Sequence, residues 1–261
     1  MLSEEERERF ARQLVLEGVG EAGQERLRAA RVLVVGAGGL GSAAAFYLTA
    51  AGVGTLGIVD HDTVSLSNLN RQILHTTAEI GRLKTESAAR RLTALNPAVN
   101  LHLYPESLTP RRAAELAAAY DLVVECSDNF ETKFLVNAAC VETGTPLVWA
   151  SVLAWEGQMS VVMPGAGPCY RCLFPPSLQL DKVPTAREVG ILGAVAGTFG
   201  ALEAVEAVKV LLSIGHPLVG REVHCPVDAG LGRRLHGRHE CATHCGDLAR
   251  PLGLAAPQTR S

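Results

Sequence analysis

The segment Arg31-Val-Leu-Val-Val-Gly-Ala-Gly-Gly-Leu-Gly41 decides the fold. Its first five residues are an almost wholly apolar run, typical of a short strand buried on both faces of a parallel sheet. An alanine-rich stretch to about Ala51 predicts a helix directly after the glycines. A strand, the pattern Gly-x-Gly-x-x-Gly and a helix in this order form a nucleotide-binding fingerprint, because glycines let the backbone approach phosphate and the helix N-terminus offers N–H groups. The candidate cofactor-binding glycines are Gly36, Gly38, Gly39 and Gly41.

Around this unit, apolar strands alternate with helices. The expected strands are Thr55–Val59, Leu101–Tyr104, Asp121–Cys126 and Pro146–Ala150, and the expected helices cover residues 3–29, 77–95, 110–119 and 131–142. This alternation predicts an α/β fold with a doubly wound, mostly parallel, Rossmann-like sheet.

The pattern changes after residue 150 and predicts a partly antiparallel C-terminal extension. An added strand is expected at Gln158–Met163, followed by a proline-rich loop over residues 174–190 and a long helix over Ile191–Ile214. In this helix we expect a charged face and a separate apolar face. The charged face would hold Glu203, Glu206 and Lys209, and the apolar face Val195, Phe199, Leu202 and Val205.

The composition excludes several broad classes. The 261 residues are 48% hydrophobic and 20% charged, and 24 Lys and Arg against 27 Asp and Glu give a net charge of -3. This balance gives no general attraction to nucleic acids or anionic membranes. The uncharged stretch Val32–Val59 is as long as a membrane helix, but its glycines divide it into strand, loop, helix, loop and strand. The charged first ten residues contain no secretory signal, so we expect a cytoplasmic protein.

Polar residues after the strands indicate which nucleotide is bound. Asp60 ends the second strand, where an acid can accept hydrogen bonds from ribose hydroxyls. A polar loop containing Arg71 follows, then Lys84 near the start of a helix and Asp128 after the fourth strand. Arginine and lysine bind phosphate oxygens, and a carboxylate is a hard ligand for Mg²⁺. This combination favours a triphosphate with magnesium over a dinucleotide, and no Gly-Lys-Ser/Thr motif follows the glycines to indicate a Walker A site.

Four of the seven cysteines form two close pairs, Cys169–Cys172 and Cys241–Cys245. Paired cysteines without a secretory signal point to metal binding rather than disulfides. Four thiolates would form a closed, structural zinc site. The wider spacing of the second pair leaves open whether His244 replaces one of its cysteines, and the alternative is two unrelated pairs, one of them a redox dithiol. Cys126 and Cys140 are expected in the core.

Several spaced motifs together resemble the ThiF/MoeB/HesA family, bacterial relatives of ubiquitin-activating enzymes, over about residues 5–246. They are Arg12-Gln13, Gly36–Gly41, Asp60-x-Asp62, Ser67-Asn68-Leu-x-Arg71-Gln72, Lys84, Asp128-Asn129-Phe and Cys169-Tyr-Arg-Cys172. The resemblance implies an adenylyltransferase. In this reaction the C-terminal carboxylate of a ubiquitin-like sulfur-carrier protein ending in Gly-Gly attacks the α-phosphate of MgATP, and an acyl-adenylate and pyrophosphate form.

The same resemblance assigns roles to residues. Asp60 would hold the ribose, Asp128 would bind Mg²⁺, and Asn68, Arg71 and Lys84 would bind the phosphates. Asp62, Gln72 and Asn129 are the other implied nucleotide-binding residues. Arg12 would act in trans, reaching the triphosphate bound by the partner in a homodimer. We expect one domain over residues 1–261, with an N-terminal helical arm (1–30), a nucleotide-binding half (31–150) and a carrier-binding and zinc half (151–250).

Two features depart from the family pattern. Many relatives carry a cysteine for thioester or persulfide chemistry before the long helix, but here Ala186 or a neighbour takes that place and no cysteine lies between Cys172 and Cys225. We therefore expect an enzyme that only adenylates its carrier. Lys133 stands where relatives often have arginine. Two alternative functions remain open, an NAD-dependent oxidoreductase and a non-catalytic ATP-binding adapter, and the pathway could be molybdopterin, thiamine or cysteine synthesis or tRNA thiolation.

Overall fold

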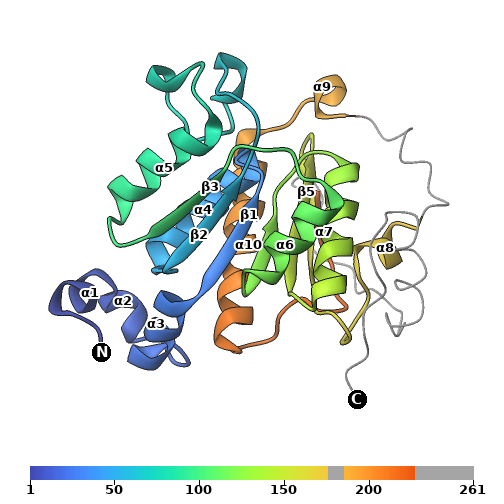
Figure 1. Cartoon of the computed structure of the whole chain (residues 1–261). Helices are drawn as coiled ribbons and strands as arrows, with labels where there is room; N and C mark the ends of the chain where they lie inside the picture. Colours follow the sequence, from blue (N-terminus) through green and yellow to red (C-terminus); the bar gives the residue numbers. More distant parts are fainter. Residues whose placement is uncertain (176–184, 227–261) are drawn as a thin grey trace.

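The structure is a computed structural model that describes residues 1–175 and 185–226 (Figure 1). Within this part of the chain, seven strands form one sheet in the order β3-β2-β1-β4-β5-β6-β7. The strands are β1 (Arg31–Val35), β2 (Thr55–Val59), β3 (Asn100–Tyr104), β4 (Leu122–Glu125), β5 (Leu147–Leu153), β6 (Glu156–Val162) and β7 (Val223–Pro226). Strands β1 to β5 pair in parallel, and β6 and β7 are antiparallel to their neighbours. The predicted mostly parallel sheet with an antiparallel edge is confirmed.

Helices cover both faces of the sheet (Figure 1). Helices α4 (Gly39–Ala51), α5 (Lys84–Leu95) and α10 (Gly193–Leu212) contribute to one core, and α6 (Pro110–Ala118) and α7 (Phe130–Thr143) contribute to the other. Short helices α8 (Tyr170–Leu173) and α9 (Ala186–Val189) flank the second half of the sheet. The N-terminal segment forms α1 (Glu4–Arg9), α2 (Ala11–Leu14) and α3 (Gly20–Ala29), three helices where one helical stretch was expected.

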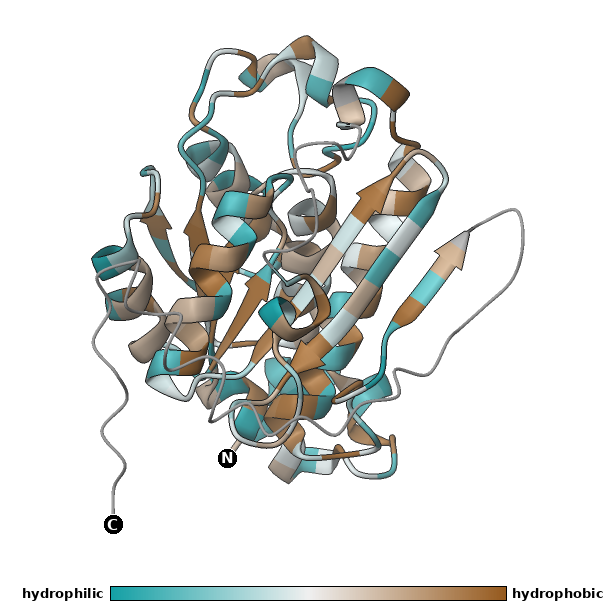
Figure 2. Cartoon of the chain, turned by 90° about the vertical axis from the view of Figure 1, so that its right-hand side faces the viewer, coloured by the Kyte–Doolittle hydropathy of each residue, from teal (hydrophilic) through white to brown (hydrophobic). Residues whose placement is uncertain are grey.

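Strand β1 supplies side chains to both cores. Val32 and Val34 lie in the core with α4 and α10, whereas Leu33 and Val35 lie in the core with α6 and α7. Successive side chains of a strand point to opposite faces, so an uninterrupted apolar run suits a strand covered on both sides. Figure 2 shows hydrophobic residues concentrated in the strands at the centre of the molecule.

The uncharged stretch Val32–Val59 is divided as expected into β1, α4 and β2. Helix α4 ends at Gly52, whose φ of 86° is in the left-handed region that terminates helices. Among the described residues, no helix combines the length and apolar character that crossing a membrane requires.

The expected helix over residues 77–95 begins later than predicted. Residues Thr77–Glu79 form a single 3-10 turn (η2), and α5 starts at Lys84. Gly81 lies between them with a φ of +87°. A residue in the left-handed region interrupts a right-handed helix. The helix predicted from the sequence therefore began too early, at Thr77 instead of Lys84.

The expected faces of α10 are wrong in part: Val195 and Phe199 are buried as expected, but the glutamates and the other two apolar residues are exchanged. Glu203 and Glu206 are buried with 0% and 5% exposure, whereas Leu202 and Val205 are 37% and 53% exposed. Positions 195, 199, 203 and 206 share one face of a helix with 3.6 residues per turn, and α10 turns that face to α4 and the sheet. The buried glutamates have partners, because Glu206 pairs with Lys209 and Glu203 accepts a hydrogen bond from the Cys126 thiol.

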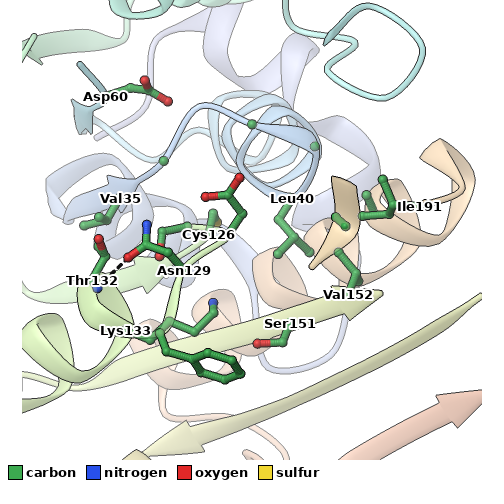
Figure 3. A pocket seen from close by; sticks show the side chains of 18 of the residues that line it. Val35, Leu40, Asp60, Cys126, Asn129, Thr132, Lys133, Ser151, Val152 and Ile191 are labelled. Carbon is green, nitrogen blue, oxygen red and sulfur yellow. Dashed lines mark hydrogen bonds between the residues drawn. The ribbon is translucent and has the colours of Figure 1, made fainter. Parts of the chain in front are cut away.

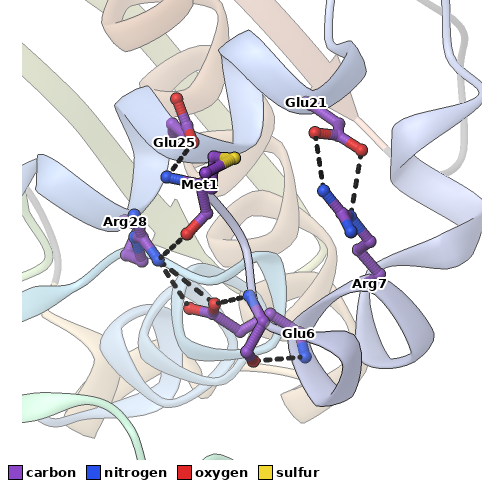
Figure 4. A network of polar contacts seen from close by, with 7 residues as sticks. Met1, Glu6, Arg7, Glu21, Glu25 and Arg28 are labelled. Atoms are coloured by element: carbon purple, nitrogen blue, oxygen red, sulfur yellow. Dashed lines mark hydrogen bonds and ion pairs between the residues drawn. The ribbon is translucent and has the colours of Figure 1, made fainter.

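The N-terminal arm packs at the C-terminal end of α4. Phe10 is buried, and a Cβ built on Gly52 would lie 2.6 Å from its ring. The side chains of Gln13 and Gln24 both donate to the carbonyl of Ala51, at 3.0 and 2.9 Å. Within the arm, three ion pairs join its first residues to α3 (Figure 4). They link Met1 with Glu25, Arg7 with Glu21 and Glu6 with Arg28. These pairs are largely exposed and each contributes little, so the buried Phe10 and Gln24, with the hydrogen bond of the half-buried Gln13, fix the arm.

Close packing of α10 on α4 gives a stability prediction. A Cβ on Gly200 would lie 2.2 Å from the carbonyl oxygen of Leu40, whereas a Cβ on Gly197, about one turn earlier, meets nothing within 4 Å. We expect Gly200→Ala to lower the free energy of unfolding by about 1–3 kcal/mol, because α10 must move away from α4. The control Gly197→Ala should raise it by about 0.5–1 kcal/mol. Urea unfolding followed by circular dichroism measures both, and equal stability of the two variants would contradict this packing.

Candidate functional site

A cavity of about 910 Å³ opens where the parallel strands end at their carboxyl edge (Figure 3). Doubly wound sheets bind their ligands at this edge. Most of the predicted site residues line the cavity, namely Gly36, Gly38, Gly39, Asp60, Asp62, Arg71, Gln72, Lys84, Asp128 and Asn129. Gly41, Asn68 and Arg12 do not line it. The structure therefore brings three separate polar segments to the glycine loop.

The glycine loop needs its glycines for two different reasons. Gly36 has a φ of +95°, and a Cβ there would lie 2.9 Å from the carbonyl oxygen of Cys126. A Cβ on Gly41 would lie only 1.9 Å from the carbonyl oxygen of Gly36. Gly41 thus allows α4 to start directly against β1, and its contribution to the site is indirect.

Asp60 holds the backbone around the glycine loop. One carboxylate oxygen accepts from the N–H of Ala37 at 2.8 Å, and the other accepts from the N–H of Asp62 at 2.9 Å. The ammonium of Lys84 lies 2.7 Å from an Asp62 oxygen and 3.8 Å from an Asp60 oxygen. Lys84 is buried in the first turn of α5, so it is part of the cavity wall and is not a solvated surface charge.

The loop that follows β2 presents Arg71 and Gln72. Its turn η1 (Leu66–Asn68) is closed by Asn68, whose side-chain oxygen accepts from the N–H of Ser65 at 3.0 Å. The Arg71 guanidinium donates to the carbonyl of Ser67 at 3.0 Å. Gln72 is buried, and its side-chain oxygen has no protein hydrogen-bond partner within the described residues.

Asp128 and Asn129 lie between β4 and α7. The side chain of Asn129 caps α7 by accepting from the N–H of Thr132 at 2.8 Å (Figure 3). Asp128 is exposed at the edge of the cavity. The N-terminal end of α7 therefore faces the cavity with a carboxylate beside it, which suits a cation and an anionic ligand together.

A second buried lysine, Lys133, lies in the cavity wall (Figure 3). Its ammonium pairs with Glu125 and donates to the carbonyl of Ala150 at 2.7 Å. Glu203 lies nearby and accepts from the Cys126 thiol at 3.4 Å. Burial raises the pKa of Glu203 well above its ordinary value, although the charge of Lys133 opposes the rise. One buried lysine therefore lies beside two buried carboxyl groups, and burial favours the protonated form of Glu203.

In the sequence, Lys133 stands out only as a replacement for arginine, and its carboxyl partner Glu125 and the nearby Glu203 were not predicted. Glu125 lies inside an apolar strand, and Glu203 shares a helix face with Val195 and Phe199. A charged residue in a strand expected to be buried on both faces is the signal that could have found this cluster.

The cavity continues beyond the glycine loop along β5 and β6. Ser151, Val152, Glu156 and Gln158 line this part, and Ile191 covers it from the segment before α10 (Figure 3). The Ser151 hydroxyl is buried and has no protein hydrogen-bond partner within the described residues. No sequence motif marks these residues, so the sequence did not predict them as lining a cavity.

Cys169 and Cys172 meet at the start of α8. The N–H of Cys172 donates to the carbonyl of Cys169 at 2.9 Å, and their sulfur atoms lie 3.7 Å apart. Two thiolates on a tetrahedral zinc, each about 2.3 Å from the metal, would be about 3.8 Å apart. This pair fits two ligand positions of zinc. Cys241, His244 and Cys245 lie outside the described residues. Cys126 and Cys140 are buried in the core as expected.

Arg12 lies on α2, away from the cavity. It is exposed in the N-terminal arm, which packs at the C-terminal end of α4, whereas the glycine loop lies at the N-terminal end. A helix of 13 residues is about 20 Å long at 1.5 Å per residue. Arg12 and the cavity are therefore separated by the length of α4 within one chain.

The fold and the cavity together define a Rossmann-like α/β protein with a cavity at the carboxyl edge of its sheet, where doubly wound sheets bind their ligands. The chain belongs to the ThiF family, whose profile matches residues 10–229.

Curated relatives cover nearly all of this chain. The sulfur carrier protein adenylyltransferase of Thermus thermophilus is 45% identical over 251 residues, which cover 94% of this chain and 93% of that protein. The protein named adenylyltransferase and sulfurtransferase MOCS3 of Sus scrofa is 47% identical over 249 residues, 94% of this chain and 54% of that protein. This chain thus spans about half the length of its MOCS3 relative.

Solved structures support the fold. The crystal structure of E. coli MccB with ATP is similar with a TM-score of 0.75 and 22% identity, over 86% of this chain and 68% of that one. PaaA is similar with a TM-score of 0.76 and 21% identity, over 90% of this chain and 85% of that one.

The raised pKa of Glu203 gives a prediction for stability against pH. Above pH 4.5, the ordinary pKa of a glutamate, the unfolded chain releases the carboxyl proton of Glu203 but the folded protein retains it. The free energy of unfolding therefore falls as the pH rises above 4.5. We expect Glu203→Gln to match the wild type near pH 5 and to become increasingly more stable above it, by up to about 1.4 kcal/mol per pH unit.

Urea unfolding between pH 5 and 9 measures this difference. The control Glu115→Gln removes an exposed carboxyl whose pKa is lowered by a hydrogen bond from Arg111, and should show no such gain. A difference between Glu203→Gln and wild type that is independent of pH would contradict a retained proton on Glu203.

Proposed function

We propose that this protein is an ATP-dependent adenylyltransferase that activates the C-terminal glycine carboxylate of a ubiquitin-like sulfur-carrier protein as an acyl-adenylate. One observation carries the proposal: a single cavity holds the glycine loop, the acid Asp60, the cations Arg71 and Lys84, and Asp128. The relative from Thermus thermophilus is named a sulfur carrier protein adenylyltransferase and is covered almost completely by this chain, which supports the same reaction here.

The chemistry accounts for this set of residues. A carboxylate that attacks the α-phosphate approaches a polyanion, and the leaving pyrophosphate gains negative charge, so the site must supply positive charge. We assign Arg71 and Lys84 to the phosphates, with Asn68 supporting their loop, Asp60 to the ribose, and Asp128 to the Mg²⁺ that enters with ATP. Asp62, Gln72 and Asn129 complete the nucleotide end of the cavity.

The remaining part of the cavity gives the carrier a place to bind. This part of the cavity runs along β5 and β6 and is continuous with the nucleotide end. A linear peptide tail ending in Gly-Gly needs such a continuous path to reach the nucleotide. Ala186 lines the cavity in the segment that carries a cysteine in many relatives. We therefore propose that the enzyme adenylates its carrier and forms no thioester through this segment. An NAD-dependent oxidoreductase does not explain cations and an acid gathered at one glycine loop. A non-catalytic adapter would bind MgATP with the same residues, and it differs from the proposed enzyme by showing no pyrophosphate exchange.

Removing the proposed phosphate and magnesium residues should abolish most activity. We expect Arg71→Ala, Lys84→Ala and Asp128→Ala each to lower the rate of ATP–pyrophosphate exchange by about 10²–10³, the loss typical of one preorganised stabilising group. Exchange is measured with candidate carriers ending in Gly-Gly, and melting curves confirm folding. The control Arg111→Ala removes an exposed arginine on α6 and should keep full activity. Wild-type protein without exchange on any carrier, or fully active Arg71→Ala and Asp128→Ala variants, would contradict the proposal.

We propose further that the protein works as a homodimer in which Arg12 completes the partner's site. The separation of Arg12 from its own cavity by the length of α4 supports this arrangement. An interface that places α2 of one copy beside the cavity of the other would bring a third cation to the triphosphate.

Mixed dimers test this arrangement. Arg12→Ala and Arg71→Ala chains, each nearly inactive alone, should regain about a quarter of wild-type exchange when co-expressed, because half the dimers are mixed and each contains one intact site. The control mixture of Arg71→Ala with Lys84→Ala should regain none, since both residues belong to the same chain's site. No recovery in the first mixture would place Arg12 in its own chain's site or outside any site.

We propose a structural zinc held by Cys169, Cys172, Cys241 and Cys245, with His244 as the alternative to one of the second pair. The sulfur spacing of the first pair supports it. A zinc with four protein ligands would supply binding energy to the fold and would take no part in the reaction.

Metal analysis tests the zinc proposal. We expect about one zinc per wild-type chain, and loss of the metal with a lower melting temperature in Cys169→Ser. The control Cys140→Ala changes a core cysteine of α7 and should retain the metal. Wild-type protein purified without zinc and unchanged by added zinc would contradict the proposal.

A further inference from the structure

The imidazole of His75 is buried beneath the glycine loop and lines no part of the cavity. Its Nε2 lies 2.9 Å from the carbonyl oxygen of Ala37, and its Nδ1 lies 2.8 Å from the hydroxyl oxygen of Ser87. The Ser87 hydroxyl in turn donates to the carboxylate of Glu79. His75, Ser87 and Glu79 are 5%, 0% and 7% exposed, so this chain of hydrogen bonds is shielded from water.

This side chain connects the three segments that carry the proposed phosphate-binding groups. His75 belongs to the loop that presents Arg71, and its backbone N–H donates to the carbonyl of Gln72 at 3.1 Å. Ala37 lies inside the glycine loop. Ser87 is on α5, one turn after Lys84. One imidazole thus fixes the distances among the glycine loop, the arginine loop and the lysine helix.

The two hydrogen bonds to Ala37 hold the glycine loop from both sides. Asp60 accepts from its N–H, and His75 meets its carbonyl. Because a carbonyl oxygen only accepts, Nε2 must carry a hydrogen and act as the donor. Gly36, next to Ala37, has no side chain to restrict its backbone, so these two contacts supply the restraint that the loop's own sequence lacks.

We propose that His75 is a positioning residue for ATP: it orients the glycine loop relative to Arg71 and Lys84 by donating from Nε2 to the carbonyl of Ala37. The inference rests on the proposed use of ATP. The His75 side chain lines no part of the cavity, so its effect reaches the nucleotide through the Ala37 backbone. Loss of this bond weakens ATP binding and leaves the chemical step nearly unchanged.

Burial and the neighbouring charges act on the pKa of His75 in both directions. Burial lowers the pKa of His75, and the nearby ammonium of Lys84 lowers it further, while Asp60 and Glu79 oppose the shift. The Arg90 guanidinium lies 3.9 Å from the Glu79 carboxylate and adds a positive charge at the Glu79 end of the hydrogen-bond chain. Nε2 carries a hydrogen in the charged ring as well as in one neutral tautomer, so donation to the Ala37 carbonyl does not depend on the charge of the ring.

Four variants separate positioning from general stability. His75→Phe keeps an aromatic ring and removes both polar contacts, whereas His75→Gln retains an N–H₂ group where Nε2 was. Ser87→Ala leaves the ring without its Nδ1 partner. The control Asn96→Leu removes a buried side-chain donor to the carbonyl of Thr49 at the far end of α4.

Calorimetric titration with MgATP and ATP–pyrophosphate exchange give the readouts, with melting temperatures measured for each variant. We expect His75→Phe to raise the dissociation constant and the KM for ATP about tenfold while kcat changes little, the loss typical of one buried hydrogen bond. His75→Gln should recover most of the affinity, and Ser87→Ala should fall between them. Asn96→Leu should lower the melting temperature and leave ATP affinity unchanged.

Three results would overturn the inference: wild-type affinity in both His75→Phe and Ser87→Ala, no recovery in His75→Gln, or an equal loss of affinity in Asn96→Leu. Failure of the proposed function looks different. Wild-type protein that binds MgATP but exchanges no pyrophosphate with any carrier would remove the adenylyltransferase assignment, and the affinities would still decide the role of His75. Wild-type protein that does not bind MgATP would remove both.

Discussion

The close approach of α4 to β1 is the constraint on which the rest of the molecule depends. The carbonyl of Gly36 and the Cα of Gly41 are so close that a single methyl group at Gly41 would overlap the carbonyl oxygen. Because the helix begins there, its N-terminal N–H groups lie at the carboxyl edge of the sheet, beside the ends of β2 and β4. Asp60 and Asp128 reach the same place only because their strands flank β1 in the parallel sheet.

The residues of the glycine loop do not by themselves make the loop rigid. Glycine permits the left-handed turn at Gly36 but does not favour it over other conformations. The loop is held instead by neighbours: Asp60 on one side of Ala37, His75 on the other, and Cys126 pressed against Gly36. The same Asp60 that is proposed to bind ribose thus also shapes the phosphate loop, so substitution of this acid affects two functions at once.

The sequence predicted those features that local chemistry determines. Apolar runs and glycine spacing were sufficient for β1, α4 and β2, and the order of strands and helices for a parallel sheet. It could not predict which side of α10 faces inward, because the partners of its buried glutamates include groups from other segments. Glu203 accepts from the Cys126 thiol, and Glu206 accepts from the N–H of Leu218 in addition to its pair with Lys209. The His75 contacts and the part of the cavity along β5 and β6 likewise depend on tertiary neighbours that no short motif records.

The cations of the cavity differ in how readily they can exchange their partners for phosphate. Lys84 pairs with Asp62, whose side chain is 54% exposed, so releasing this carboxylate into water costs little. Arg71 bonds a backbone carbonyl in an exposed loop and can also turn to a ligand. Lys133 instead pairs with Glu125, which is 1% exposed, and removing its partner would leave an uncompensated buried charge. These partners suit Arg71 and Lys84 to the proposed triphosphate binding, whereas Lys133 lies in the cavity wall beside the core.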